Sequence, residues 1–154
     1  MLTFDINERS IYLADSVVDI FRQFRNLKRR NESGGVVLGQ VDETERRILV
    51  CRASIPSELD ESAKNAFYRD MRAAKQIVEY EFYNSLGKNT YLGEWHTHPA
   101  KKAIPSNQDV KMIKEQFEIS ELRVNFILMF VVASSEMFIG LYNGKEISSV
   151  TVLF

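Results

Sequence analysis

The only two histidines of the chain lie two residues apart, in His96-Thr97-His98. On a β-strand, residues i and i+2 project from the same face, so both imidazoles could reach one metal ion while Trp95 and Thr97 point the other way. Pro99 follows directly and would end the strand, which places the pair at an edge where a ligand can enter. An isolated His-x-His pattern can also be purely structural, and these residues alone leave that open.

A carboxylate follows the histidines on the first turn of a predicted helix, at Asp109. One oxygen ligand beside two imidazoles makes the three-ligand set with an open position that is typical of catalytic zinc. The stretch from Ser106 to Asp109 also has the Ser-x-x-acid pattern of a helix N-cap. The two residues could therefore simply cap each other, and the local sequence favours that interpretation.

A second carboxylate, Glu32, precedes Gly34 and Gly35 and a predicted strand. Paired glycines let the backbone approach a bound substrate closely or adopt a positive φ angle. A carboxylate next to a zinc-bound water could take its proton and pass it to a leaving nitrogen. A glutamate in a solvated loop would look the same in the sequence, so this alternative stays open too.

Hydrophobic periodicity predicts the elements that must position these side chains. Helices are predicted for residues 15–30, for residues 68–86 and for a segment that begins at Ser106. A first strand is predicted to begin at residue 36, and further strands are predicted for residues 47–55, 90–97, 125–133, 137–142 and 147–154. Residues 31–35 break the first helix, residues 56–65 form a polar loop, and residues 99–105 form a second loop. Strands interrupted by helices, with a closing meander, indicate a mixed α/β (α+β) sandwich in one domain, residues 1–154.

Several local signals support these boundaries. In the first helix, Asp15 or Ser16 can cap the start, the stripe Val17, Phe21, Phe24 and Leu27 faces inward, and the cations at 28–30 offset the dipole of the last turn. In the second helix, Met71, Ala74, Val78 and Phe82 share one face and Gly87 ends the helix. In the third, Val110, Ile113 and Phe117 point inward. Residues 42–44 form the turn of a hairpin, and Asn143-Gly144 is a strong hairpin signal.

Composition excludes several classes of protein. The 154 residues carry 20 basic and 21 acidic side chains, a formal net charge of −1, which argues against a nucleic-acid partner. Cys51 is the only cysteine, so no intramolecular disulfide can form, and a reducing compartment is expected. Its apolar neighbours predict strand packing. The longest apolar run, 124–133, is about half the length of a membrane helix. We therefore expect a cytoplasmic protein with no membrane partner.

Taken together, the motifs resemble those of the JAMM (JAB/MPN-type) metalloproteases. Their pattern is a glutamate ahead of a Gly-rich strand, then His-x-His-Pro, seven residues, Ser, two residues and Asp. Here Glu32 precedes Ser-Gly-Gly-Val-Val-Leu-Gly, His96-Thr97-His98-Pro99 follows, and the seven residues 99–105 lead to Ser106 and, after two more, to Asp109. The resemblance covers nearly the whole chain and implies a JAB/MPN-like, cytidine-deaminase-like architecture, a mixed sheet sandwiched by helices.

The resemblance also implies roles for these residues. His96, His98 and Asp109 match the ligands of one Zn²⁺ per chain, Glu32 the general acid and base, and Ser106 the side chain that stabilises the oxyanion. Scaffold members of the family lack some of these groups, whereas this chain has them all. The implied protein is a zinc-dependent isopeptidase, a deubiquitinase-like hydrolase.

The short chain is most similar to the prokaryotic branch of the family. This implies removal of a ubiquitin-like or C-terminally conjugated protein in an anti-phage system, such as CBASS, with E1- and E2-like enzymes as further partners. Residues 56–65 could clamp the extended tail of such a substrate, or form an idle surface loop. The alternatives are processing of a ubiquitin-like or sulfur-carrier precursor and a zinc-stabilised, non-catalytic scaffold. A DNA-repair-associated branch also shares the fold, but the missing basic surplus counts against it.

Overall fold

The computed structural model describes residues 1–25, 31–63 and 66–154. Its centre is an eight-stranded mixed sheet in the order β1-β2-β4-β3-β7-β8-β9-β10, and β5 and β6 form a separate hairpin. The elements are β1 (Leu2–Ile6), β2 (Arg9–Leu13), α1 (Asp15–Phe24), β3 (Gly34–Val41), β4 (Arg47–Ala53), β5 (Glu61–Ala63), β6 (Ala66–Tyr68), α2 (Met71–Asn84), β7 (Thr90–Thr97), α3 (Asn107–Ile119), β8 (Ile127–Val132), β9 (Glu136–Tyr142) and β10 (Ile147–Leu153).

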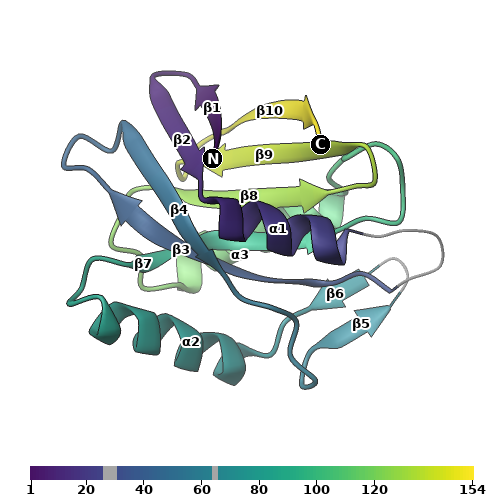
Figure 1. Ribbon diagram of the computed structural model, residues 1–154, viewed down its shortest axis with the longest axis horizontal. Helices are drawn as coiled ribbons and strands as arrows, with labels where there is room; N and C mark the ends of the chain where they lie inside the picture. Colours follow the sequence, from purple (N-terminus) through teal and green to yellow (C-terminus); the bar gives the residue numbers. More distant parts are fainter. Residues whose placement is uncertain (26–30, 64–65) are drawn as a thin grey trace.

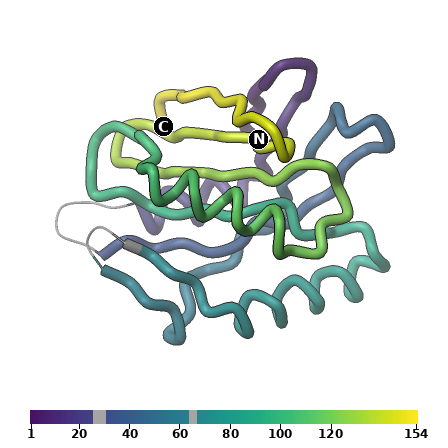
Figure 2. The backbone as a smooth tube through the Cα atoms, turned by 180° about the vertical axis from the view of Figure 1, so that it is seen from behind, coloured from purple at the N-terminus to yellow at the C-terminus, as the bar shows by residue number. Residues whose placement is uncertain are grey.

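Helices cover both faces of the large sheet. Figure 1 shows α1 lying across the near face, and Figure 2, from behind, shows α3 crossing the opposite face with α2 beside it. Each face has its own apolar core. Phe21 of α1 packs with Trp95 of β7 in one core, and Ile113 of α3 packs with Val131 of β8 in the other. The predicted mixed sheet between helices is therefore confirmed.

The neighbouring strands β7 and β8 run parallel, and α3 connects them. Every residue of β8 is buried, because the strand has a core on each face. A crossover between parallel strands leaves the C-terminal end of the first strand and returns the chain to the end at which that strand began. The first turn of α3 therefore lies at the C-terminal end of β7. The next strand, β3, runs antiparallel to β7 and begins at that same end.

The two outer strands of the sheet curl towards each other. Figure 1 shows β1 beside β10 at the upper edge, and the Asn7 Nδ2 group donates a hydrogen bond of 2.9 Å to Ser148 Oγ. Strand twist makes an open sheet of this size curl in this way. The N-terminal hairpin of β1 and β2 that provides one of these edges was not among the predicted elements.

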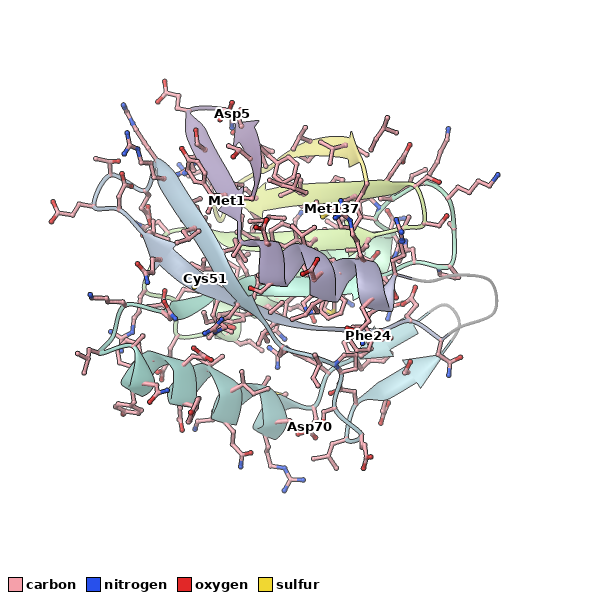
Figure 3. The ribbon with its side chains drawn as sticks, in the orientation of Figure 1. Met1, Asp5, Phe24, Cys51, Asp70 and Met137 are labelled. Carbon is pink, nitrogen blue, oxygen red and sulfur yellow. The ribbon has the colours of Figure 1, made fainter. Side chains whose placement is uncertain are left out.

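The first helix is shorter than predicted. It ends at Phe24, labelled in Figure 3, because Arg25 takes an extended backbone conformation (φ −56°, ψ 137°). Ala14 occupies the N-cap position without a side-chain hydrogen bond, so the predicted capping by Asp15 or Ser16 was wrong. The predicted last turn, with Leu27 and the cations at 28–30, lies outside the described residues. The strand that follows starts at Gly34, two residues before the predicted position.

The predicted loop and second helix also need correction. Part of the loop is strand β5, paired with β6, so Tyr68 lies in a strand rather than in a helix. The helix α2 starts after its N-cap Asp70 (Figure 3), whose side chain accepts a hydrogen bond from the Ala73 N–H group. Met71 is 65% exposed rather than buried, because it sits in the first turn beyond the core. The helix ends at Asn84 with Ser85 as its C-cap, two residues before the predicted end, and Gly87 lies beyond it with φ +80°.

Other boundaries agree with the predictions. The strand β7 has the predicted limits, the β3–β4 hairpin is antiparallel, and Asn143 and Gly144 lie in the turn between β9 and β10. Gly144 has a φ of +91°, which explains the requirement for glycine there. Cys51 is half-buried on β4. Within the described residues, no helix is both long enough and apolar enough to cross a bilayer.

Candidate metal centre

The alternation of strand β7 brings the two imidazoles to one face. His96 is 2% exposed and His98 is partly buried beside it, while Trp95 points into the core under α1. The antiparallel register pairs Gly34 of β3 with His96. Continuing that register places Glu32 opposite His98, and the Thr97 N–H group donates to the Ser33 carbonyl at 2.8 Å. The strand pairing therefore brings the glutamate to the histidines.

The carboxylate of Asp109 is held by the start of α3. Ser106 is the N-cap, its Oγ accepts from the Asp109 N–H group at 3.1 Å, and Asp109 Oδ2 accepts from the Ser106 N–H group at 2.8 Å. This is a complete capping box, as the local sequence predicts. The same carboxylate also faces both histidines, so capping and ligation are compatible at this residue.

Three side chains converge within a few ångströms. His96 Nε2 lies 3.2 Å from Asp109 Oδ1, His98 Nε2 lies 3.0 Å from Asp109 Oδ2, and the two Nε2 atoms are 3.1 Å apart. Within the described part of the chain, His96 Nδ1 has no hydrogen-bond partner, so this ring interacts through Nε2.

The donor set fits a zinc ion. Ligands about 2.0–2.1 Å from a tetrahedral centre lie about 3.3–3.4 Å from one another, close to the separations of these nitrogen and oxygen atoms. Two imidazole nitrogens and a carboxylate are also a common ligand set for catalytic zinc. Among the residues that the structure describes, His96, His98 and Asp109 are the one group of three such side chains close enough to share an ion.

The charges and hydrogen bonds of this group shift the pKa values of Asp109 and His98. Burial alone would raise the pKa of Asp109, but hydrogen bonds from His96 and His98 lower it well below its usual range. Burial alone would lower the pKa of His98, but the hydrogen bond and the charge of Asp109 raise it. The carboxylate is therefore kept ionised next to the imidazoles, the state in which it can bind a cation.

Glu32 borders the group without joining it. Its Oε1 atom lies 3.7 Å from His98 Nε2, and the residue is 5% exposed. Burial raises its pKa, partly opposed by the nearby His96 and His98. Glu32 is thus neither a solvated loop residue nor a member of the three-residue group. Its carboxylate lies beside the three candidate ligands, where a proton-exchanging group could act.

The loop between His98 and Ser106 is fastened to the neighbouring strands. Its buried Ala103 N–H group donates to Glu136 Oε2 at 3.1 Å, and the Ala100 carbonyl accepts from the Ser134 N–H group at 3.0 Å. These bonds fix the path of the loop that joins the histidines to α3. They fix in turn the position of Asp109.

A groove of about 610 Å³ lies next to His96, between the hairpin strand β6 and the helix α3. Phe67 and Tyr68 line one side, and Gln108 and Lys111 the other. On its floor Arg69 contacts Glu94, two residues before His96 on the same face of β7. The sequence analysis missed this pair. Glu94 could have been found, because it lies two residues before His96 and therefore shares its face of the strand.

Comparison with known proteins identifies the family of this chain. Residues 14–142 match the model for prokaryotic homologs of the JAB domain. The chain belongs to this family. The matched region includes the histidines, Asp109, Ser106 and Glu32, so the family resemblance inferred from their spacing is confirmed. The roles of the individual residues stay predictions.

Several relatives of this JAB protein carry one name, CD-NTase/cGAS isopeptidase. The Pseudomonas aeruginosa protein is 31% identical over 106 residues, which cover 68% of this chain and 66% of that protein. The Vibrio cholerae protein is 29% identical over 132 residues, 86% of this chain and 78% of that protein. The Escherichia coli protein is 24% identical over 136 residues, 88% of this chain and 83% of that protein.

The fold of the JAB protein also has a counterpart among solved structures. The solution structure of a Desulfitobacterium hafniense protein superposes with a TM-score of 0.60 at 20% identity, covering 91% of this chain and 89% of that one. At this identity the similarity concerns the architecture alone.

Proposed function

We propose that this JAB protein is a zinc-dependent isopeptidase that removes a protein conjugated through its C-terminus. One observation carries the proposal: His96, His98 and Asp109 converge within 3.0–3.2 Å of one another, and Glu32 faces His98 from the segment that leads into β3. In this proposal the first three residues hold one Zn²⁺ ion. The complete donor set argues against a non-catalytic scaffold.

The chemistry divides between the ion and the side chains. A bound zinc ion supplies Lewis-acid polarisation and makes water a nucleophile near neutral pH. Glu32 accepts a proton from the attacking water and later delivers it to the departing amine nitrogen. Water oxygen thereby forms a bond to the carbonyl carbon, the C–N bond breaks, and the products are a carboxylate and an amine. The Ser106 hydroxyl donates to the oxyanion that develops on the carbonyl oxygen.

The groove beside His96 supports a substrate with an extended tail. Within the described residues β6 pairs only with β5, so its outer edge could bind an extended segment as an added strand. Gln108 Nε2 donates a hydrogen bond to Tyr68 Oη, which joins the two sides of the groove and would have to yield to such a tail. The β5–β6 hairpin, predicted as a loop that clamps substrate or lies idle, is thus a candidate clamp.

The names of the relatives support a more specific substrate. They act on CD-NTase/cGAS proteins by name, and we propose the same substrate class here: a cyclic-nucleotide-synthesising enzyme conjugated through its C-terminus in a CBASS system. E1- and E2-like enzymes that form the conjugate would be the functional partners.

Replacing Glu32 tests the mechanism. Glu32→Gln should lower kcat by about 100- to 10,000-fold, because the amide cannot accept the proton, while one zinc ion per chain is still bound. The measurement is cleavage of a CD-NTase fused or conjugated through its C-terminus, together with zinc determination by elemental analysis. His96→Ala, which should lose the metal as well as the activity, is the matched variant. Full activity in Glu32→Gln, or in wild type stripped by a chelator, would contradict the proposal.

A further inference from the structure

A buried ion pair lies two residues from the metal centre. Arg69 Nε is 2.8 Å from both carboxylate oxygens of Glu94, and Arg69 Nη2 is 2.8 Å from Glu94 Oε1. Their side chains are 16% and 6% exposed. Tyr91 also donates its hydroxyl to Glu94, and Arg69 Nη2 donates to Gln116 Oε1 of α3 at 3.0 Å. The guanidinium group thus joins β7 to α3.

Arg69 stands at the exit of the β5–β6 hairpin. It follows the last residue of β6 and precedes Asp70, the N-cap of α2. Asp60 ties the two ends of the hairpin together, since its Oδ1 accepts from the Asp70 N–H group and its Oδ2 from the Ser57 N–H group, both at 2.6 Å. The Arg69 side chain therefore anchors the whole hairpin to the strand that carries the histidines.

The other end of this connection is Glu32. Its N–H group donates to the Ala63 carbonyl of β5 at 2.7 Å, and Ser62 Oγ donates to the Glu32 carbonyl. Phe67 of β6 covers Gly34, so closely that a Cβ on Gly34 would lie 2.7 Å from the phenyl ring. The backbone on both sides of the Glu32 side chain is thus held by the hairpin.

Stability alone does not account for such a pair. The cost of desolvating two charges can exceed their attraction, so a buried ion pair is weak evidence of stabilisation. Its geometry is specific, however, because the planar guanidinium contacts a carboxylate and an amide oxygen in fixed directions. A contact of this kind defines where one element lies relative to another.

We propose that Arg69 and Glu94 are positioning residues that hold Glu32 at the metal centre through the β5–β6 hairpin. The inference rests on the proposed function to the extent that Glu32 is the proton carrier. Arg69 fixes the hairpin on β7, and the hairpin in turn fixes the backbone of Glu32 beside His98. Neither Arg69 nor Glu94 needs to touch the reacting atoms.

Hydrogen exchange measures this connection without reference to activity. The double variant Arg69→Met/Glu94→Gln removes both buried charges, and its Glu32 amide should exchange at least about tenfold faster than in wild type. Amides of the β9–β10 pairing should be unchanged. Arg52→Met is the matched control, because it removes another arginine–glutamate pair, with Glu81 at 3.5 Å, between β4 and α2. Unchanged exchange at Glu32 in the double variant would overturn the inference.

Kinetics separate positioning from substrate contact. In the double variant kcat should fall about 10- to 100-fold, since small displacements of a reacting group are costly, with KM within twofold and one zinc ion still bound. A change in KM alone would overturn the inference and make Arg69 a substrate contact. If the double variant does not fold, Arg69→Lys serves both measurements, because an ammonium group cannot contact Glu94 and Gln116 in the same fixed fork. An inactive wild type would contradict the proposed function alone, and exchange at Glu32 would still decide the connection.

Discussion

Asp109 closes a capping box and also faces both histidines. One of its carboxylate oxygens closes the capping box with Ser106 and also faces His98, while the other faces His96. The helix start thereby orients the carboxylate before any ion binds, which reduces the entropy lost on binding. Substitutions at either residue are therefore expected to change helix stability and, in the proposed function, metal binding together.

Two substitutions of Ser106 separate its roles. Ser106→Gly should cost only a few tenths of a kcal/mol, because glycine is a good N-cap, whereas Ser106→Ala should cost about 1 kcal/mol. Both remove the hydroxyl, so both should lower kcat by about 100- to 1,000-fold if Ser106 stabilises the oxyanion. Urea unfolding and cleavage kinetics on the same samples give the two quantities. Wild-type kcat in Ser106→Gly would leave Ser106 as a helix cap only.

At the scale of single residues, the sequence indicates which side chains form the candidate site better than it indicates their burial and contacts. Strand parity and a helix start place His96, His98 and Asp109 as possible ligands, but each pattern alone left a purely structural interpretation open. Only the resemblance to the JAMM pattern joined them into a three-ligand group. The burial of Glu32 was not predictable, since it depends on the hairpin that covers it. The partner of Glu94 was not predictable either, because Arg69 is distant in sequence and carries no motif.

The turn between β3 and β4 depends on one side chain. Asp42 Oδ1 accepts from the N–H groups of Arg46 and Arg47 at 3.0 and 3.1 Å, and Thr44 also donates to this carboxylate. These hydrogen bonds, led by the one from the Arg47 backbone, lower the pKa of Asp42. A carboxylate whose pKa falls on folding stabilises the protein above its unfolded pKa and loses that effect as the pH falls.

Asp42→Ala should therefore lower the free energy of unfolding at neutral pH. The difference from wild type should shrink as the pH drops below the ordinary aspartate value of 3.8, because Asp42 then binds a proton in the unfolded chain and, at still lower pH, in the folded protein as well. Urea unfolding at several pH values is the measurement. Glu43→Ala, an exposed neighbour in the same turn, is the control and should change little. A difference that stays constant down to pH 3 would exclude the ionised carboxylate as its cause.

Elements with strong periodicity were predicted well, and elements held by distant partners were not. The limits of β7 and the turn after β9 follow from local sequence. The first helix was predicted too long, because its apolar stripe continues past the residue at which the backbone becomes extended. The β5–β6 hairpin is short, and it contacts the backbone of Glu32, a distant partner that no local pattern reports.

At the scale of the whole molecule, the apolar cores are independent of the metal centre. The larger core joins α1 to one face of the sheet, and the smaller core joins α2 and α3 to the other. Both cores are built from apolar side chains on either face of the sheet. A chain of this length can bury enough apolar surface to fold without a structural metal.

Chelation should consequently inactivate the protein without unfolding it. At a free zinc concentration of about 100 times Kd, binding stabilises the folded state by about 2.7 kcal/mol, so stripping the ion should lower Tm by roughly 5–11 °C. Calorimetry and far-ultraviolet circular dichroism before and after chelation give the answer. Readdition of zinc should restore both Tm and cleavage. Complete unfolding by the chelator would instead support a scaffold in which the metal has a structural role.

The contact between β1 and β10 affects where an extended segment of another protein can pair with this molecule. Exposed strand edges attract other chains and lead to aggregation. Here the edge strands of the large sheet turn towards each other and are joined by the hydrogen bond between Asn7 and Ser148, which leaves little space for another strand to pair with them. The outer edge of β6, beside the groove, is more accessible to such a strand. A partner drawn by backbone hydrogen bonding would thus be guided to the groove rather than to the far side of the molecule.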